Sequence, residues 1–296
     1  MTITPDFFGV PVSLVSEPPE MLFPVVFNSA HSGRYYPQGF ASQTRLDART
    51  LRKSEDCHVD GLFAPVVNHG MALHTANFPR AYVDVNREPY ELDPRMFDGA
   101  LPAHANIGSP RVAGGLGSVP RVVDEGVEIY GRRIPVSEGL ERIERVYKPF
   151  HRTMRALLSR THLQFGEVIL LDCHSMPSTL KIGAHGVCPD IVLGNRFGAS
   201  AAPDITDCAI DALQALSLSV VCNKPYAGGY ITEHYGRPRH GFHALQIEIN
   251  RALYMDEASL ELTAGFAALR TALERFACVF ARQVGRLSYR YPLAAE

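Results

Sequence analysis

The sequence lacks the cysteine pattern, the basic tracts and the long apolar runs that identify several large classes of protein. Its six cysteines are scattered singly through 296 residues, without a C-x-x-C pair or the density of a disulfide-stabilised domain, so we expect reduced thiols. The 29 Lys and Arg balance 31 Asp and Glu to a net charge of -2, and no basic tract could neutralise a row of phosphates. A nucleic-acid partner is therefore not expected.

A membrane span and an export signal are not expected either. Residues 1–6 carry no basic segment ahead of an apolar stretch, and no window approaches the roughly 20 apolar residues that cross a bilayer. We therefore expect a cytoplasmic protein without a membrane partner. Core-forming residues are present in ordinary amounts, because 46% of the chain is hydrophobic and 20% is charged.

Short apolar runs alternate with amphipathic stretches, which is typical of an α/β protein with its site at the ends of strands. No repeat or linker divides residues 1–296, so we expect one domain. The periodicity predicts strands at 21–27, 81–86, 167–171, 189–193, 219–222 and 245–249. It predicts helices at 54–70, 140–158, 203–216 and 258–284, and long loops at 104–120 and 224–240.

Two histidines, His31 and His174, each follow a predicted buried strand. Neutral imidazoles that arrive at adjacent strand ends can share one zinc ion, although a single histidine is more often an ordinary core or surface residue. A third ligand is needed. Glu55 and Asp56 are both candidates, because they open the first predicted helix, where the helix dipole favours a carboxylate.

Glu248 lies on the polar face of a predicted strand whose other face is apolar. A carboxylate next to an activated water can take its proton and later pass it to a leaving amine, whereas the alternative is a solvated surface glutamate. Cys173, beside His174, suggests a thiol nucleophile. Adjacent strand residues point to opposite faces, however, so we expect a packed thiol.

The segment 78–88 supplies cationic and amide side chains from one predicted short strand. Arg80 stands alone, and Asn86 and Arg87 form a pair; guanidinium groups bind carboxylates and developing oxyanions through two parallel hydrogen bonds. Asp84, on the same strand face as Asn86, is expected to orient the arginines. The alternative is a solvated edge at which Arg87 forms only a weak surface ion pair.

Taken together, these segments resemble the N-formylglutamate amidohydrolase (deformylase) family, which is related to the zinc carboxypeptidase and aspartoacylase superfamily. The resemblance extends over nearly the whole chain, and its specificity comes from several segments that occur in the same order. They are SAHSGRYYP at 29–37, EDCHVDGLF at 55–63, FPRAYVDVNREPYELDPRMF at 78–97, GGLGSVPRVV at 114–123, LLDCHSMPS at 170–178, and GGYITEHYGRP with HALQIEINRALYMD at 228–256.

The resemblance implies one zinc ion and a single three-layer domain, with a mixed central sheet flanked by helices in a zinc carboxypeptidase-like arrangement. It also implies hydrolysis of a small-molecule carboxylate, N-formyl-L-glutamate, to formate and L-glutamate during histidine breakdown. Carried over to this chain, it makes His31 and His174 zinc ligands, Glu248 the general base, Arg80 the group that polarises the scissile carbonyl, and Asn86 with Arg87 the site of the substrate α-carboxylate.

One position departs from the superfamily pattern. The superfamily places its carboxylate ligand three residues after the first histidine, where this chain has Arg34, so the ligand must come from elsewhere. We prefer Asp56 to Glu55, because Asp56 and Asp60 would lie one helical turn apart on a common face, one to bind the ion and the other to support it.

Two other functions fit the same residues. One is a zinc amidohydrolase that acts on a different N-acyl amino acid, or on a C-terminal peptide bond as a carboxypeptidase does. The other is a non-catalytic carboxylate-binding protein that has kept the scaffold. The joint presence of His31, His174 and Glu248 argues against this second alternative.

Overall fold

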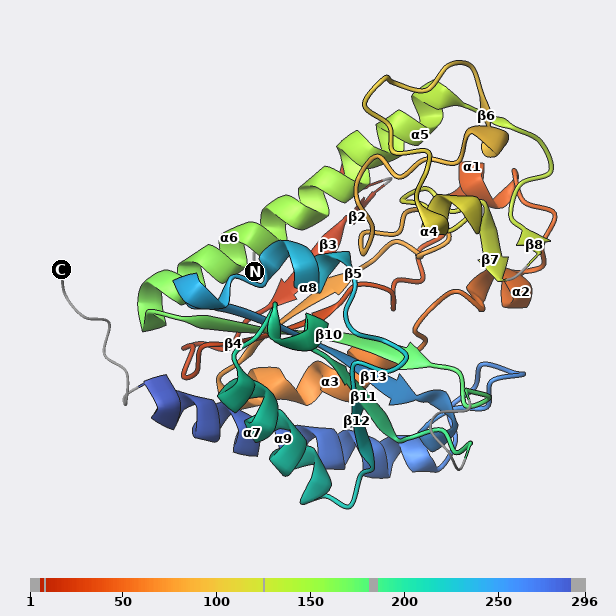
Figure 1. Ribbon diagram of the computed structural model, residues 1–296. Coiled ribbons are helices and arrows are strands. Elements are labelled where there is room, and N and C mark those ends of the chain that lie inside the picture. Colours follow the sequence, from red (N-terminus) through yellow and green to blue (C-terminus); the bar gives the residue numbers. More distant parts are fainter. Residues whose placement is uncertain (1–5, 8, 125, 181–185, 289–296) are drawn as a thin grey trace.

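A seven-stranded mixed sheet forms the centre of the computed structural model, which describes residues 6–7, 9–124, 126–180 and 186–288 (Figure 1). The strand order is β12-β11-β13-β10-β4-β5-β3. The strands are β3 (Ser13–Ser16), β4 (Val25–Ser29), β5 (Ala72–Ala76), β10 (Val168–Met176), β11 (Ile191–Gly194), β12 (Val220–Cys222) and β13 (Phe242–Asn250). The pairs β5-β4, β4-β10, β10-β13 and β11-β12 are parallel, whereas β3-β5 and β11-β13 are antiparallel.

Helices cover both faces of this sheet, which confirms the predicted fold class. On one face, α6 (Lys148–Phe165) packs Phe150 and Met154 against Val26 and Leu170. Figure 1 shows α3 (Val59–Phe63), α7 (Pro203–Gln214) and α9 (Gly265–Ser288) on the opposite side. The side chains of this second core that come from the strands and from α9 include Phe27, Leu171, Cys173, Ile247, Phe276 and Phe280.

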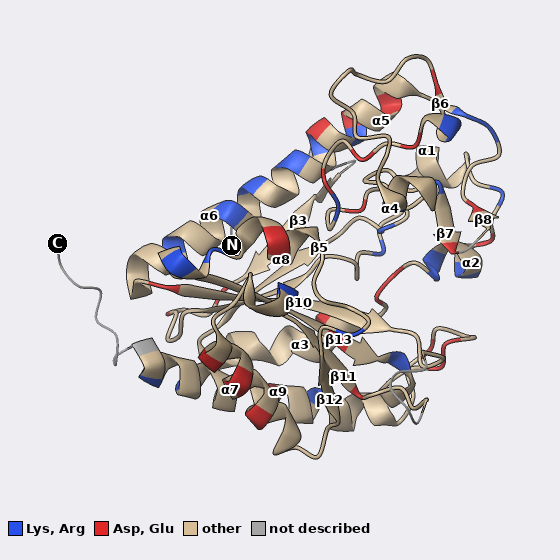
Figure 2. Ribbon diagram, viewed as in Figure 1, with Lys and Arg blue, Asp and Glu red and all other residues tan. Residues whose placement is uncertain are grey.

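The alternation of side chains along the strands separates these two cores. Leu170 faces the α6 side while Leu171 faces α9, and Ala244 and Leu245 divide in the same way. Every residue of β10 is buried, as is expected of a central strand with helices on both faces. Figure 2 shows the charged residues mainly along the helices and in the loops, with the strands largely free of them.

The shorter elements lie between and beside these units. They are β1 (Asp6–Phe7), β2 (Val10–Pro11), α1 (Gln38–Ala41), α2 (Ala48–Arg52), η1 (Ala64–His69), η2 (Pro94–Met96), β6 (Phe97–Asp98), α4 (Pro110–Ala113), β7 (Val122–Asp124), β8 (Val127–Glu128), β9 (Ile134–Pro135), α5 (Val136–Arg142), η3 (Ile143–Tyr147), η4 (Arg196–Gly198), α8 (Tyr230–Tyr235), η5 (Pro238–His240) and η6 (Arg251–Leu253). Among the described residues, we find no helix whose length and apolar content would let it span a lipid bilayer.

The prolines within the predicted helices have the expected effects. Pro65 stands in the first turn of η1, so the α-helical part ends at Phe63 and a 3-10 helix continues to Gly70, whose φ of 78° closes it. Pro149 follows the π-helical turn η3 inside the long helix. Because proline cannot donate to the carbonyl four residues back, a wider turn just before it relieves the conflict.

Three predictions of local structure are wrong. The segment 81–86 is a series of turns and not a strand, although it is almost entirely buried. The helix expected from Ser54 begins only at Val59, after a residue in the left-handed region, His58 with φ 67°. The closing helix also begins later than expected, at Gly265 instead of residue 258.

Candidate metal and catalytic site

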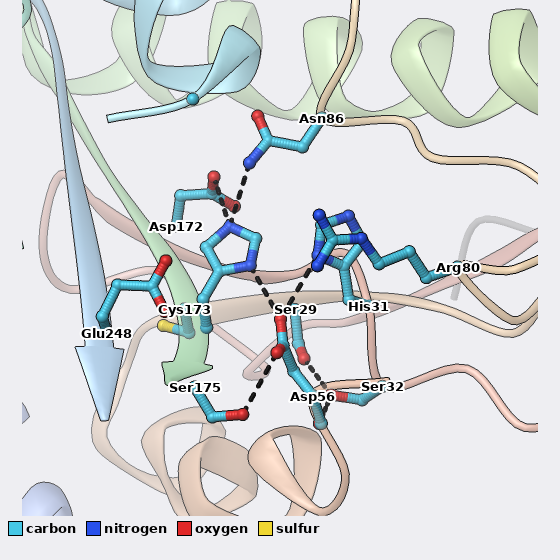
Figure 3. Close-up of polar contacts among 12 residues, drawn as sticks. Ser29, His31, Ser32, Asp56, Arg80, Asn86, Asp172, Cys173, Ser175 and Glu248 are labelled. Atoms are coloured by element: carbon cyan, nitrogen blue, oxygen red, sulfur yellow. Dashed lines mark hydrogen bonds and ion pairs between the residues drawn. The ribbon is translucent and has the colours of Figure 1, made fainter. Parts of the chain in front are cut away.

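The carboxyl ends of the parallel strands β4, β10 and β13 meet at one edge of the sheet, and the candidate residues gather there (Figure 3). His31 lies two residues beyond β4, whereas His174 lies within β10, near its end. Glu248 in β13 stands directly opposite His174 in the strand register. This arrangement brings together groups that are far apart in the sequence.

His31, Asp56 and His174 converge in a way that fits a metal ion. Nδ1 of His31 lies 3.2 Å and Nδ1 of His174 lies 2.9 Å from the same carboxylate oxygen, Oδ2 of Asp56. The ring centroids are 4.8 Å apart, and one ligand atom from each of the three residues lies within 4.8 Å of the others. Two imidazole nitrogens and one carboxylate oxygen are the protein ligands of a catalytic zinc ion.

The far nitrogens of both rings are held by carboxylates. Nε2 of His31 lies 2.8 Å from Oδ1 of Asp84, and Nε2 of His174 lies 2.8 Å from Oδ2 of Asp172. A carboxylate accepts only, so each Nε2 donates its proton to Asp84 or Asp172, and Nδ1, which faces the carboxylate of Asp56, is the nitrogen that would bind an ion once it carries no proton. Burial would lower the pKa of His174, but the carboxylates of Asp172 and Asp56 outweigh it and raise the pKa well above its usual value.

The carboxylate of Asp56 is itself fixed in place. Its other oxygen, Oδ1, accepts from Ser175 Oγ at 3.1 Å and from Arg251 Nη2 at 3.3 Å, while its backbone N–H donates to the carbonyl of His31. Burial would raise the pKa of Asp56, but the hydrogen bonds from His174 and His31 hold it well below the usual range. Asp56 is therefore an anion aimed at the two rings.

The structure favours Asp56 over Glu55, but for a different reason from the one based on a helical face. Glu55 points away from the histidines, toward Tyr36 Oη at 2.5 Å and Arg52 Nε at 3.0 Å. Asp56 precedes α3 and is not part of a helix, so Asp60 does not support it; instead, both oxygens of Asp60 accept from Nη2 of Arg34. The expected common helical face is thus wrong.

Glu248 is buried beside the three candidate ligands. Its Oε1 accepts from Nε2 of Gln246 at 2.8 Å, and Gln246 is in turn fixed by the backbone N–H of Gly229. Burial raises the pKa of Glu248 to about 8, and the Asp56 carboxylate adds to this effect, whereas His174 and Arg80 oppose it. A carboxylate whose pKa lies near neutrality is suited to exchanging protons with a substrate.

Arg80 extends a guanidinium group toward the same centre. Its Nε donates to Oδ2 of Asp84 at 3.0 Å, and its two terminal nitrogens have no hydrogen-bond partner in the part of the chain that the structure describes. Burial would lower the pKa of Arg80, but the carboxylates of Asp84 and Asp56 raise it. The residue is therefore a permanent cation with free donors, held in position by Asp84, as the sequence predicts.

Asn86 and Arg87 adjoin this cation. Oδ1 of Asn86 accepts from the backbone N–H of Ile231, and its Nδ2 lies 3.3 Å from Nε2 of His174. The Arg87 Nε donates to the carbonyl of Leu116 and Nη1 to the carbonyl of Asn86, while Nη2 lies 3.6 Å from Asp84. Two N–H groups of Arg87 are left over from these contacts, so the side chain is partly committed to holding the loop.

The continuous helix formed by η3 and α6 braces this irregular segment from behind. The Tyr147 hydroxyl donates to the carbonyl of Arg87 at 2.6 Å, and Nε2 of His151 lies 2.9 Å from the carbonyl of Val85. Tyr147 and His151 are four residues apart and so lie on one helix face. These contacts replace the strand pairing that the segment lacks, and they explain how turns can be buried without losing their hydrogen bonds.

Gly33 and Cys173, next to the candidate site, are explained by the packing around them. Gly33 follows the turn at His31, and a Cβ there would lie 2.1 Å from the carbonyl oxygen of Phe78, so only glycine fits. Cys173 points into the α9 core and is fully buried, as predicted, and burial raises the pKa of its thiol well above the usual value. It faces away from the site.

Sequence reasoning missed Asp172, Gln246 and Arg251 as members of the site. Asp172 could have been found, because residues two apart on a strand share a face, and Asp172 precedes His174 by two. The same rule relates Gln246 to Glu248. Arg251 follows β13, and the sequence carries no signal that it would turn back to Asp56.

Comparison with known proteins gives consistent matches. The chain matches the model of a family described as N-formylglutamate amidohydrolase over residues 23–255. It is 29% identical over 241 residues to the N-formylglutamate deformylase of Pseudomonas putida, covering 79% of this chain and 82% of that protein. The N-formylglutamate deformylase of Pseudomonas aeruginosa is also 29% identical, over 238 residues, with 79% and 83% covered.

Among solved structures, the crystal structure of N-formylglutamate amidohydrolase from Ralstonia eutropha JMP134 superimposes with a TM-score of 0.86. The two chains are 33% identical, and the match covers 94% of this chain and 98% of the other. A gene product from Agrobacterium tumefaciens has a TM-score of 0.65 at 18% identity, which shows a shared fold alone.

Proposed function

Because this chain belongs to the N-formylglutamate amidohydrolase family, we propose that it hydrolyses N-formyl-L-glutamate to formate and L-glutamate, with one zinc ion held by His31, Asp56 and His174. One observation carries the proposal. The Nδ1 atoms of both histidines face a single oxygen of Asp56, while each Nε2 is bound to a further carboxylate.

A zinc ion held by these three residues would supply Lewis acidity, which polarises a carbonyl group and lowers the pKa of bound water to about 7. Glu248 then takes a proton from the attacking water and later passes it to the departing glutamate nitrogen, so that the proton is conserved over the cycle. The terminal nitrogens of Arg80 donate to the oxygen on which negative charge develops. Asn86 and Arg87 hold the substrate α-carboxylate.

The test of this mechanism is replacement of Glu248 by Gln in the full-length chain. Glutamine keeps the hydrogen bond to Gln246 but cannot act as a base, so turnover should fall roughly 10²–10⁴-fold while zinc content and substrate affinity are kept. Near-normal turnover would show that Glu248 is not the base. Loss of zinc in the same variant would instead point to a ligand or structural role.

Substrate identity requires a separate comparison. A panel of N-formyl, N-acetyl and N-succinyl amino acids should give the highest kcat/KM for N-formyl-L-glutamate. A preference for another acyl group would keep the amidohydrolase chemistry but change the substrate. We further place this reaction in histidine breakdown in the cytoplasm; the six free thiols agree with a reducing compartment.

A further inference from the structure

A row of buried polar side chains extends from the metal site across the sheet toward its edge. Asn28 Nδ2 donates to Oδ1 of Asp172 at 2.6 Å, and Nδ1 of His74 lies 3.1 Å from Oδ1 of Asn28. Nε2 of His74 lies 2.8 Å from Oγ of Ser13. Four strands, β10, β4, β5 and β3, each contribute one member, and all four residues are fully buried.

The strand register places these residues side by side. Asp172 pairs with Asn28, and Asn28 pairs with His74, so the first two hydrogen bonds join direct neighbours on adjacent strands. Ser13 pairs with Ala76, two residues from His74 on β5, and reaches His74 diagonally. The imidazole of His74 also packs against the ring of Phe150 from α6, with centroids 4.5 Å apart. The row is therefore built into the sheet and fixed by the helix above it.

The chemistry of the groups allows only one direction for these hydrogen bonds. The carboxylate of Asp172 accepts only, so the amide nitrogen of Asn28 must face it and the amide oxygen must face His74. His74 then donates from Nδ1 and accepts from Ser13 at Nε2. Burial lowers the pKa of His74 to about 3, which keeps the ring neutral and supplies one donor and one acceptor.

We propose that Asn28 and His74 are positioning residues of the metal site, which act through Asp172 to hold the His174 ring with Nδ1 presented to the ion. This inference depends on the proposed zinc site. Asp172 has one oxygen for His174, at 2.8 Å, and one for Asn28, so the donor from Asn28 fixes the plane of the carboxylate. His74 in turn fixes the orientation of the Asn28 amide.

Packing alone does not explain this row. Buried polar groups are costly unless each has a partner, and a packed apolar set would serve stability equally well. A row whose members are all satisfied specifies one arrangement of hydrogen bonds. Asp172 is the end of the row that reaches the site, where it accepts from the His174 ring. The row therefore specifies the orientation of that ring.

The experiment compares two replacements of His74 in the full-length chain. In His74→Asn the side-chain nitrogen takes the place of Nδ1 and can still donate to Asn28, whereas His74→Leu removes that donor. Both variants lose the contact with Ser13. Zinc affinity is measured by competition with a chromogenic chelator, and kcat and KM are measured for N-formyl-L-glutamate.

We expect His74→Leu and Asn28→Leu to weaken zinc binding about 10-fold, which is the lower end of the effect of replacing a partner of a metal ligand. The same variants should have a lower kcat and a nearly unchanged KM. His74→Asn should bind zinc nearly as tightly as the wild type. Leu73→Ala is the matched control, because Leu73 is adjacent on β5 but faces the other core. It should lower thermal stability and leave zinc affinity unchanged.

Equal zinc affinity in His74→Leu and Leu73→Ala would overturn the inference while leaving the proposed function intact. Failure of the wild-type chain to bind zinc would overturn both. If His74→Leu does not fold, Ser13→Ala provides a milder change, since it removes only the hydroxyl that faces His74. The inference then requires weaker zinc binding in Ser13→Ala than in Leu73→Ala, and the reverse order would refute it.

Discussion

Replacement of His151 by Gln should change how the stability of the protein depends on pH. The His151 ring is buried between Tyr147 and Tyr235, with Nε2 at the carbonyl of Val85 and Nδ1 2.8 Å from the Tyr235 hydroxyl. Burial lowers the pKa of His151 to about 3, and the nearby His234 and Arg155 add to this effect, although the contact with Val85 opposes it.

The direction in which stability changes with pH follows from comparing the pKa of His151 in the folded and unfolded chains. In the unfolded chain the pKa of His151 is 6.5, so the ring binds a proton below about pH 6.5. In the folded chain the ring binds that proton only near pH 3. The contribution of neutral His151 to the free energy of unfolding is complete above pH 6.5 and is lost as the pH falls below that value. At about pH 4.5, two units below 6.5, the loss is about 2.7 kcal/mol, because each unit corresponds to about 1.36 kcal/mol.

Glutamine keeps a donor for Val85 but does not titrate, so the variant should escape this loss. Near pH 7 it should be about 1 kcal/mol less stable than the wild type, because the contact with Tyr235 is weakened. Between about pH 7 and about pH 4.5 the difference should shift by about 2.5 kcal/mol in favour of the variant. The rank order of the two proteins should therefore reverse.

Urea unfolding followed by far-ultraviolet circular dichroism is the suitable assay, because the chain has no tryptophan. Tyr235→Phe is the control: it removes the same contact, but burial raises the pKa of Tyr235, so the hydroxyl does not titrate in this range. The plot of stability against pH for Tyr235→Phe should stay parallel to that of the wild type. If the curve for His151→Gln is also parallel to the wild type, His151 is not held neutral by the fold and the reasoning fails.

Two other substitutions test the site directly. Asp56→Asn should abolish stoichiometric zinc, whereas Glu55→Gln should keep zinc and lower stability, since the Glu55 carboxylate bonds Tyr36, Arg52 and Cys57 and not the histidines. Metal analysis by mass spectrometry decides, and equal zinc content in the two variants would contradict the assignment. Tyr147→Phe should raise KM several-fold with a smaller effect on kcat, because the Arg87 carbonyl loses its hydrogen bond; steady-state kinetics showing an unchanged KM would refute the bracing role.

The sequence predicts the central strands and long helices well, because their periodicity is strong. The family resemblance is confirmed by the match over residues 23–255, and the predicted mixed sheet is present. The failures have physical causes. Residues 81–86 alternate like a strand, but their carbonyls and amides bond His151, Arg142 and neighbouring loops, so no strand partner is needed. Strands β3 and β5 are short, and their pattern does not distinguish them from loops.

Within the site, the residues that face the centre were easier to predict than those that support them. His31, His174 and Glu248 stand at the ends of apolar runs, where a polar side chain is conspicuous. The partners of Asn28 and His74 are set by the register of four strands, which no local pattern specifies. Asp56, and not Glu55, lies beside the two histidines, but the helical argument for preferring it was wrong.

Arg34, at the position where the superfamily resemblance predicts a carboxylate, forms an ion pair in this chain. Arg34 stands three residues after His31, and Asp60 stands four after Asp56; Nη2 of Arg34 donates to both oxygens of Asp60, at 2.8 and 2.7 Å. Because both side chains are partly exposed, the pair contributes only about 0–1 kcal/mol. Its effect is geometric, since it joins the segment that carries the first histidine to the segment that carries the substitute carboxylate. The pair therefore links the segments of two candidate metal ligands, His31 and Asp56.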